Sequence, residues 1–367
     1  MHIYLHVPFC ARRCSYCDFA IAVRREVPSG AYADAILQEW ALWQSEPVWE
    51  QDPEIQTIYF GGGTPSRISA EAVARLLDRI TGDRPVASDA EITLEANPDD
   101  VTLPLATAWR AAGVNRVSLG VQSFDPAVLR WMHRVHTADH VPRAVEALRR
   151  ADIENLSLDL IFGLPASLGR DWEKDLARAF SLKPEHLSLY GLTVEPHTVL
   201  GHQAGRGELT PVDEEQYAAE FLAAHRMLLS HGYDHYEVSN AALPGYRSRH
   251  NSAYWRRATF IGLGPSAHSG HASERCWNVR EWAAYERAVT SGASPVAGRE
   301  RLDPGAIRLE EVYLGLRTSD GLPAGRLRPD VREQWEKSGW ASCASDRLHL
   351  TPEGWLRLDA LVPAGDS

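Results

Sequence analysis

Six short stretches rich in β-branched and aromatic residues recur along the first half of the chain and predict strands. They are near-continuous apolar runs rather than alternating ones, which is typical of parallel strands buried on both faces. The predicted strands are residues 3–7, 55–60, 91–96, 116–121, 156–162 and 186–192.

Helical patterns fill the intervals between these strands. Apolar residues recur at helical spacing over 29–43, where Ser29 is the expected N-cap. The amphipathic pattern repeats over residues 71–80, 141–150, 171–180 and 214–231. Strand alternating with helix predicts an α/β protein with a parallel sheet and right-handed crossovers. Six such units are compatible with an open doubly wound sheet and with an incomplete barrel.

Beyond residue 235 the pattern changes twice. A short strand over 236–240 leads into a loop-rich stretch that runs to Trp277, and from about Asp303 a small helical region follows, with a short strand, a turn and a last helix. We therefore expect three parts, with the third leaning on the first. They are a core of residues 1–235, an extension of residues 236–300 and an accessory domain of residues 301–367.

Composition and charge narrow the classes of function. Hydrophobic residues make up 44% of the 367 positions, which is enough for a packed core, and the net charge is −11. No basic run stands out, so a nucleic-acid partner is disfavoured. We see no signal peptide and no apolar run long enough to span a bilayer. The clustering of three of the five cysteines indicates a reducing compartment, with the cytoplasm as the default, and a metal site.

The three clustered cysteines, Cys10, Cys14 and Cys17, directly follow the first predicted strand. Structural zinc requires four closed ligands, so a zinc loop or three incidental thiols are the alternatives to a cluster. Three thiolates can hold a [4Fe–4S] cluster and leave one iron with an open coordination site, where a substrate can bind. The other two cysteines, Cys276 and Cys343, are expected to be inert and buried.

Polar residues and glycines follow the other predicted strands at their carboxyl ends. In barrels of parallel strands the active site lies at this end. The residues are the glycine-rich segment 61–66, Glu95, Gln122, Asp159, Tyr190 and Thr193. We expect them to gather around the cysteine loop.

The Cys-x3-Cys-x2-Cys spacing resembles the signature of the radical S-adenosylmethionine (SAM) superfamily. The resemblance implies that the open iron chelates the amino and carboxylate groups of SAM. One electron from the cluster then releases a 5′-deoxyadenosyl radical, so an electron donor is also implied. The corresponding fold is a partial (β/α)6 TIM-like barrel with a small, mostly helical, winged-helix-like C-terminal domain.

Eight ordered segments more narrowly resemble the family of oxygen-independent coproporphyrinogen III dehydrogenase and the related HemW-like haem chaperones. They are YLHVPFCARRCSYCDF, YFGGGTPS, LEANPDD, RVSLGVQSF, LDLIFGLP, YEVSN, HNSAYW and GLGPSAHS. By position, the resemblance assigns a SAM site to Tyr4, Tyr16, Gly62, Gly63, Thr64, Glu95, Gln122, Arg134, Asp159 and Thr193. For Glu95 or Arg134 taken alone, a buried ion pair is the alternative.

Three features favour the chaperone within this family. Phe19 stands where the dehydrogenases have a fourth cysteine, Tyr4 nearly starts the chain where they carry an extension, and HNSAYW supplies an HNxxYW element associated with haem binding. We therefore expect a protein that transfers haem to an acceptor protein. The runner-up is oxidative decarboxylation of coproporphyrinogen III, and a radical SAM enzyme with another substrate is the third hypothesis.

The resemblance makes His250 the expected haem ligand, since a neutral imidazole commonly binds haem iron. Tyr254 and Trp255 offer flat apolar contact, and Arg247 and Arg249 are expected to pair with propionates. The alternative is that His250 only hydrogen-bonds a loop.

Other partners are less defined. Cys276 as a second haem ligand, weak association with a membrane or a respiratory complex, and a monomeric or dimeric state are left open. Ala241 and Ala242 follow YEVSN, where family members often show an aromatic residue.

Overall fold

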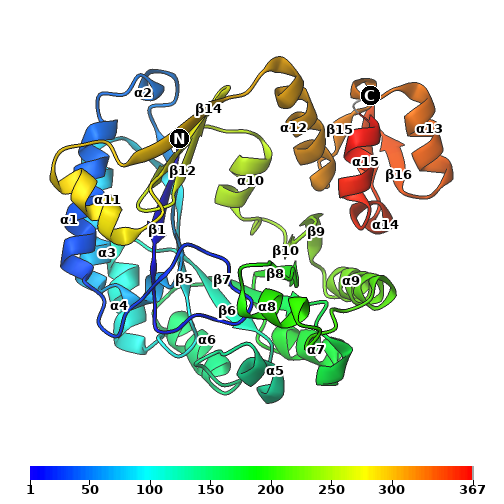
Figure 1. Cartoon of the computed structure of the whole chain (residues 1–367), viewed down its shortest axis with the longest axis horizontal. Coiled ribbons are helices and arrows are strands. Elements are labelled where there is room, and N and C mark those ends of the chain that lie inside the picture. Colours follow the sequence, from blue (N-terminus) through cyan, green and yellow to red (C-terminus); the bar gives the residue numbers. More distant parts are fainter. Residues whose placement is uncertain (366–367) are drawn as a thin grey trace.

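The structure is a computed structural model that describes residues 1–365 (Figure 1). Its main sheet has twelve strands in the order β14-β13-β12-β11-β1-β4-β5-β6-β7-β8-β10-β9. Six strands of the first half pair in parallel, each with the next along the chain. They are β1 (His2–Val7), β4 (Ile55–Gly62), β5 (Val86–Ala96), β6 (Arg116–Gln122), β7 (Asn155–Phe162) and β8 (His186–Gly191).

Five of the six predicted strands are confirmed to within two residues at their ends, and the strand predicted over 91–96 begins five residues earlier, at Val86. In the described chain β8 pairs with β10 instead of closing on β1, so the six units form the predicted partial barrel. Helices cover the outside of this sheet (Figure 1). They are α1 (Ser29–Trp43), α2 (Val48–Gln51), α3 (Ala70–Asp83), α4 (Leu103–Ala112), α5 (Pro126–Trp131), α6 (His140–Arg150), α7 (Trp172–Ser181), α8 (Val199–Gly205) and α9 (Glu214–Ser230).

The prediction that Ser29 is the N-cap of α1 was wrong. Pro28 occupies the cap position, and Ser29 is the first helical residue. The Ser29 hydroxyl instead accepts a hydrogen bond from the backbone nitrogen of Ser69 at 3.0 Å. Ser69 is itself the N-cap of α3, where its hydroxyl accepts from Ala72 at 3.2 Å. Ser29 therefore joins the starts of two neighbouring helices.

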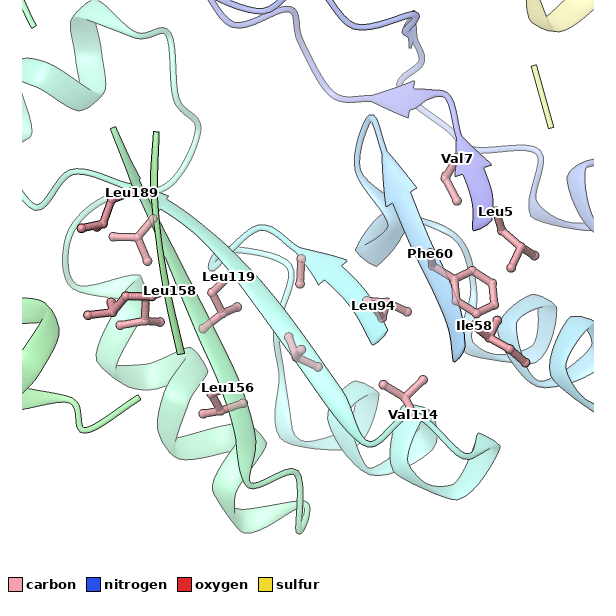
Figure 2. Packing of buried hydrophobic residues seen from close by; sticks show 14 of the residues in the cluster. Leu5, Val7, Ile58, Phe60, Leu94, Val114, Leu119, Leu156, Leu158 and Leu189 are labelled. Carbon is pink, nitrogen blue, oxygen red and sulfur yellow. The ribbon is translucent and has the colours of Figure 1, made fainter. Parts of the chain in front are cut away.

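The parallel strands were predicted as near-continuous apolar runs, but along them core residues alternate with more polar ones, which separates an apolar face from a polar face. Side chains of successive strands form one continuous buried cluster, and Figure 2 shows those of Leu5, Val7, Ile58, Phe60, Leu94, Leu119, Leu156, Leu158 and Leu189. Each such burial contributes roughly 1.5–3 kcal/mol relative to exposure. The residues between them, such as Tyr59, Glu95 and Asp159, lie on the other face, so the same pattern that builds the core also supplies a polar interior.

The stretch up to Trp277, predicted to be loop-rich, is largely regular, so this prediction was wrong. The strand predicted over 236–240 is instead a hairpin, because β9 (Asp234–Glu237) and β10 (Asn240–Ala242) pair antiparallel on either side of a two-residue turn. The elements that follow are α10 (Arg249–Trp255), β11 (Phe260–Leu263), β12 (His268–His271) and β13 (Glu274–Asn278). Apart from β11, which is largely apolar, these strands are short and carry polar residues, so pairing with the existing sheet edge determines them. β11 is parallel to β1, and β12, β13 and β14 (Val296–Arg301) continue the sheet antiparallel.

After α11 (Trp282–Thr290) and β14, the chain forms the predicted small, mostly helical C-terminal region (Figure 1, orange to red). Its helices are α12 (Pro304–Arg317), α13 (Pro329–Lys337), α14 (Pro352–Trp355) and α15 (Leu358–Gly365). β15 (Leu322–Pro323), β16 (Ala341–Ala344) and β17 (Arg347–Leu350) form a three-stranded sheet beside them. The boundaries near residues 235 and 301 stay predictions. Among residues 1–365, no helix is long and apolar enough to cross a membrane.

Candidate functional site

A cavity of about 440 Å³ lies at the carboxyl ends of the parallel strands. Twelve of the fourteen residues predicted for cluster and cofactor binding line it. They are Cys10, Cys14, Tyr16, Cys17, Gly62, Gly63, Thr64, Glu95, Gln122, Arg134, Asp159 and Thr193. Tyr4 and His250 are not part of this lining. We call this space the thiol cavity.

The cysteine loop is held at both ends and in its middle. β2 (Phe9–Cys10) pairs in parallel with β3 (Ala22–Val23), which closes the loop at its base. In the middle, the Ser15 hydroxyl donates to the carbonyl of Trp131 at 3.1 Å, and the Ser15 carbonyl accepts from the Leu200 nitrogen at 3.0 Å. The three thiols are therefore presented by a loop fixed to α5 and α8.

Two polar side chains reach the thiols directly. The Thr64 hydroxyl lies 3.3 Å from Cys10 Sγ, and Arg134 Nη1 lies 3.8 Å from Cys14 Sγ. Burial raises the pKa of Cys10 and raises the pKa of Cys17 to about 11. These two thiols therefore carry protons at neutral pH until a metal displaces them.

Glycine is required where β4 ends at the cavity. Gly62 has φ +109°, and a Cβ there would meet the His6 ring at 2.6 Å. A Cβ on Gly63 would lie 2.9 Å from the carbonyl oxygen of Val7. The backbone of this segment therefore runs close to β1, which leaves its edge free to approach a ligand.

Two half-buried carboxylates face the interior of the barrel. Glu95 accepts hydrogen bonds from the Tyr59 hydroxyl at 2.8 Å and from the Gly62 nitrogen at 3.1 Å. Burial nevertheless raises the pKa of Glu95 to about 7. Burial also raises the pKa of Asp159, although Ser118 donates to it at 2.9 Å. The cavity therefore favours protonated or newly paired carboxyl groups, as expected where a polar ligand binds.

Gln122 has an unusual backbone conformation. Its φ is +64°, and the register between β6 and β7 shifts between Gly120 and Gln122. A non-glycine residue in this region is strained, and such strain concentrates at ligand sites. The irregularity turns the end of β6 into the wall of the thiol cavity.

The donor set fits a [4Fe–4S] cluster with one open iron. Three free thiols line a single cavity beside polar groups that remain available to a second ligand. Among residues 1–365, no three His, Cys, Asp or Glu side chains are close enough to hold a single metal ion. A cubane does not require this, because each thiolate binds a different iron.

Several residues of the cavity were missed in the sequence. Asn97 and Ser118 line it, and Asn97 also accepts a hydrogen bond from Arg134. Asn97 directly follows β5, so its position after a strand was an available signal. Ser118 lies within β6, where only the alternation of inward-facing residues could have revealed it.

Comparisons with known proteins agree with this geometry. The profile of the radical SAM superfamily matches residues 4–179. The chain is 39% identical over 379 residues to the heme chaperone HemW of Escherichia coli K12. This alignment covers 99% of this chain and 97% of that protein. It is 36% identical over 363 residues to HemW of Mycobacterium tuberculosis H37Rv, covering 98% and 93%. The chain belongs to the HemW family of radical SAM proteins.

The fold is also that of a solved relative outside the HemW family. The solved coproporphyrinogen III oxidase (HemN) from Escherichia coli, a radical SAM enzyme, superposes with a TM-score of 0.79. The match covers 100% of this chain and 89% of that one, at 21% sequence identity. This similarity shows the fold alone, and it includes the C-terminal region.

In this HemW-family chain the HNSAYW segment forms α10, and its histidine is deeply buried. His250 is 1% exposed. One ring nitrogen, Nδ1, lies 2.6 Å from the Thr57 hydroxyl, and the other, Nε2, lies 2.8 Å from the Tyr254 hydroxyl. Its ring stacks on Tyr59 at 5.0 Å. Burial lowers the pKa of His250 well below its ordinary value, so the imidazole is neutral.

The start of α10 is tied into the barrel. Glu91 accepts hydrogen bonds from the backbone nitrogens of Arg249 and His250, each at 3.0 Å. Tyr59 then connects this helix to the thiol cavity, since its ring contacts His250 and its hydroxyl donates to Glu95. Tyr4 stacks on Tyr59 at 6.1 Å, and its hydroxyl lies 3.2 Å from His6 Nδ1.

The remaining residues predicted around haem point in different directions. Arg249 pairs with Asp89 at 3.1 Å on the barrel side, whereas Arg247 pairs both with Asp234 of β9 and, at 3.1 Å, with Asp320 of the C-terminal region. Trp255 is half-buried and lies under the guanidinium of Arg317 at 4.3 Å. The segment is thus divided between the barrel interior and the junction with the C-terminal region.

The two isolated cysteines differ. Cys276 is buried on β13, as expected. Cys343 is exposed, so the prediction that it is buried was wrong. It lies on β16, the outer strand of the small three-stranded sheet, where only one face is covered.

Proposed function

We propose that this protein is a haem chaperone that binds haem and transfers it to an acceptor protein. One observation carries the proposal. Identity of 36–39% spans nearly the whole of this chain and of two proteins named heme chaperone HemW. Phe19, 57% exposed, supports it, because it occupies the edge of the thiol cavity where the family's dehydrogenases have a fourth cysteine.

The radical SAM fold implies a [4Fe–4S] cluster and SAM as cofactors. When bound, the cluster supplies the electron that reductive cleavage of SAM requires. Cys10, Cys14 and Cys17 would hold the cluster, and the backbone of Gly62 and Gly63 would meet the amino-acid end of SAM.

The rest of the thiol cavity would position SAM. Arg134, held by Asn97 and by the Gly120 carbonyl at 2.8 Å, keeps a fixed positive charge beside the cluster. Glu95, Gln122 and Asp159 would contact the polar groups of SAM, with Tyr16 and Thr193 next to the adenosine. Because burial raises the pKa of Glu95 to about 7, a cationic or hydrogen-bonding ligand would favour its ionised form.

His250 remains the proposed ligand of haem iron. A neutral imidazole is the form that binds iron, and burial keeps His250 neutral. Both ring nitrogens are engaged in the conformation described, so ligation would require the bond to Tyr254 or the bond to Thr57 to open.

Partners beyond haem follow from the same proposal. An acceptor protein and an electron donor are required, and a reducing compartment such as the cytoplasm suits thiols that must stay unpaired. Weak association with a membrane or a respiratory complex, a monomeric or dimeric state, and the division into residues 1–235, 236–300 and 301–367 are further parts of the proposal.

The experiment is an anaerobic optical titration of the reconstituted full chain with haem, followed by transfer to an apo haem protein. We expect saturation near one haem per chain, weaker binding by His250→Ala and normal binding by Thr57→Val. The second variant removes a hydrogen bond of the same imidazole but keeps the ring. Equal weakening in both variants would indicate general loosening of α10 and reject His250 as the ligand. Conversion of coproporphyrinogen III without haem transfer would replace the chaperone by the dehydrogenase.

A further inference from the structure

A second cavity, of about 550 Å³, opens between α10 and the C-terminal region. One wall comes from Tyr236 and the segment from Arg247 to Arg257, and the other from the end of α12, the β15 segment and β17. We call it the interdomain cleft. It shares no lining residue with the thiol cavity, and nothing in the SAM site accounts for it.

Positive charge is concentrated in this cleft. Five arginines line it, against two carboxylates, in a chain whose net charge is −11. The arginines are Arg247, Arg256, Arg257, Arg326 and Arg347. Asp234 and Glu310, which do not line the cleft, also pair with Arg247 and Arg257, so the five arginines exceed the carboxylates that they contact by one positive charge. This local excess of positive charge favours an anionic ligand.

The two lining carboxylates are shared among several arginines, and among the described residues Arg256 and Arg326 have no other carboxylate partner, so these two guanidinium groups are incompletely neutralised. Asp320 lies 3.1 Å from Arg247 and 3.6 Å from Arg256. Glu311 lies 2.9 Å from Arg326 and 3.7 Å from Arg257. Further carboxylates would therefore find charged donors with free hydrogen-bonding capacity.

Arg347 has no carboxylate partner among the described residues. Its guanidinium donates to the backbone carbonyls of Asp320 and Gly321, each at 2.6 Å. These bonds fix the side chain in the mouth of the cleft without neutralising it. A planar guanidinium held in this way is suited to a carboxylate.

Apolar side chains also lie on both walls of the cleft. Trp255, Leu322 and Pro323 line it together with the Tyr236 ring. Trp255 Nε1 is buried and has no hydrogen-bond partner within the described chain. Flat apolar surface next to several arginines matches a ligand with a planar apolar body and acidic groups at its edge.

We propose that the interdomain cleft binds the two propionate carboxylates of haem, and that the C-terminal region supplies part of this site through Arg326 and Arg347. The inference rests on the proposed haem-chaperone function and deepens it. It differs from the expectation that Arg249 contacts a propionate, since that side chain faces Asp89 and Gln56 on the barrel side. Haem bound here would contact both parts of the chain at once.

The test compares haem with haem dimethyl ester, in which both carboxylates are neutral, as ligands of the full chain. Arg256→Gln and Arg326→Gln are the variants, because both side chains are more than half exposed and their ion pairs contribute little to stability. Arg328→Gln is the matched control, since this exposed arginine lies in the same region outside the cleft. Iron and sulfide content and the melting temperature verify that each variant is intact.

We expect the wild type to bind haem at least tenfold more tightly than the ester. Each cleft variant should bind haem about tenfold more weakly, with little change for the ester, and the double variant should lose the discrimination. Arg328→Gln should match the wild type. Equal affinity for haem and ester, or haem binding unchanged in the double variant, would overturn the cleft while leaving haem binding by the chain in place. Absence of specific haem binding by the wild type would overturn the proposed function and this inference with it.

Discussion

The thiol cavity and the interdomain cleft are built in opposite ways. The thiol cavity collects residues from the ends of six parallel strands, and its central carboxylates, Glu95 and Asp159, accept hydrogen bonds from the neutral side chains of Tyr59 and Ser118. The cleft forms where α10 faces α12 and the three-stranded sheet, and two of its five arginines, Arg256 and Arg326, are more than half exposed. The first site is fixed by the topology of the sheet, whereas the second depends on how two parts of the chain dock.

The difference is visible within α10. His250 and Tyr254 are hydrogen-bonded to each other on the side facing the barrel, while Trp255 lines the cleft. A segment that is continuous in the sequence therefore contributes to two environments, and residues separated by more than 100 positions share the thiol cavity. Substitutions in one region should leave the other measurably intact, and four experiments test this separation.

The largest effect is expected from Cys14→Ala. Two thiolates hold a cubane poorly, so we expect loss of most cluster iron and sulfide after anaerobic reconstitution. Cys343→Ala is the control, because that thiol is exposed and remote from the thiol cavity. A normal iron and sulfide content in Cys14→Ala would reject the cluster assignment. The melting temperature of the C-terminal region should be unchanged.

The second-largest effect is expected from Arg317→Gln, which removes a contact between the C-terminal region and β9. Arg317 Nε lies 3.1 Å from Glu237 Oε2, an ion pair by distance although the angle is too bent for a hydrogen bond. Glu237 is fully buried, so the variant leaves a buried carboxylate without its cation and should destabilise the junction by about 4 kcal/mol.

Hydrogen exchange over residues 303–365, together with thermal unfolding, measures this loss. Cluster content should be unchanged, which separates the junction from the thiol cavity. Arg328→Gln is again the control. If exchange in α12 and α15 does not accelerate, the Glu237–Arg317 pair does not hold the two parts together.

The two regions also differ in how far the sequence alone could predict them. The parallel strands can be recognised in the sequence from their apolar residues. Because the active site of such a barrel lies at the carboxyl ends of its strands, Glu95, Gln122 and Asp159 are then predicted to lie together. No local pattern marks the cleft, because Arg256 and Arg347 meet only through the docking of α12 and the three-stranded sheet. For the same reason the sequence could suggest that His250 binds haem but not that Thr57 and Tyr254 occupy both of its ring nitrogens.

A third experiment uses the pH dependence of stability in the cluster-free chain. The pKa of Glu95 is about 7 in the folded protein, because burial disfavours its ionised form, and about 4.3 when unfolded. The stabilising effect of its protonated form is therefore complete below about pH 4 and is lost as the pH rises through 7. The total is about 4 kcal/mol.

Glu95→Gln should flatten the fall in the free energy of unfolding between pH 5 and pH 8, measured by urea titration. Glu274→Gln, which changes an exposed carboxylate far from the cavity, should keep the wild-type slope. An unchanged slope in Glu95→Gln would mean that the carboxylate is solvated or paired in solution.

The smallest effect comes from one substitution made in both regions. Thr198 and Thr351 are N-caps of α8 and α14, and their hydroxyls accept from Gly201 at 3.0 Å and Gly354 at 3.1 Å. Alanine at either position should cost about 1 kcal/mol of stability. Only α8 also binds the cysteine loop, through Leu200 and Ser15.

We therefore expect Thr198→Ala to shorten the lifetime of the reconstituted cluster in air or with a chelator, whereas Thr351→Ala should not. Because the two variants remove the same kind of N-cap, a difference in cluster lifetime at equal loss of stability would show that the contact between α8 and the cysteine loop protects the cluster. Equal lifetimes would mean that α8 does not restrain the loop, and that β2, β3 and the Ser15 contact to Trp131 are sufficient to hold the three thiols.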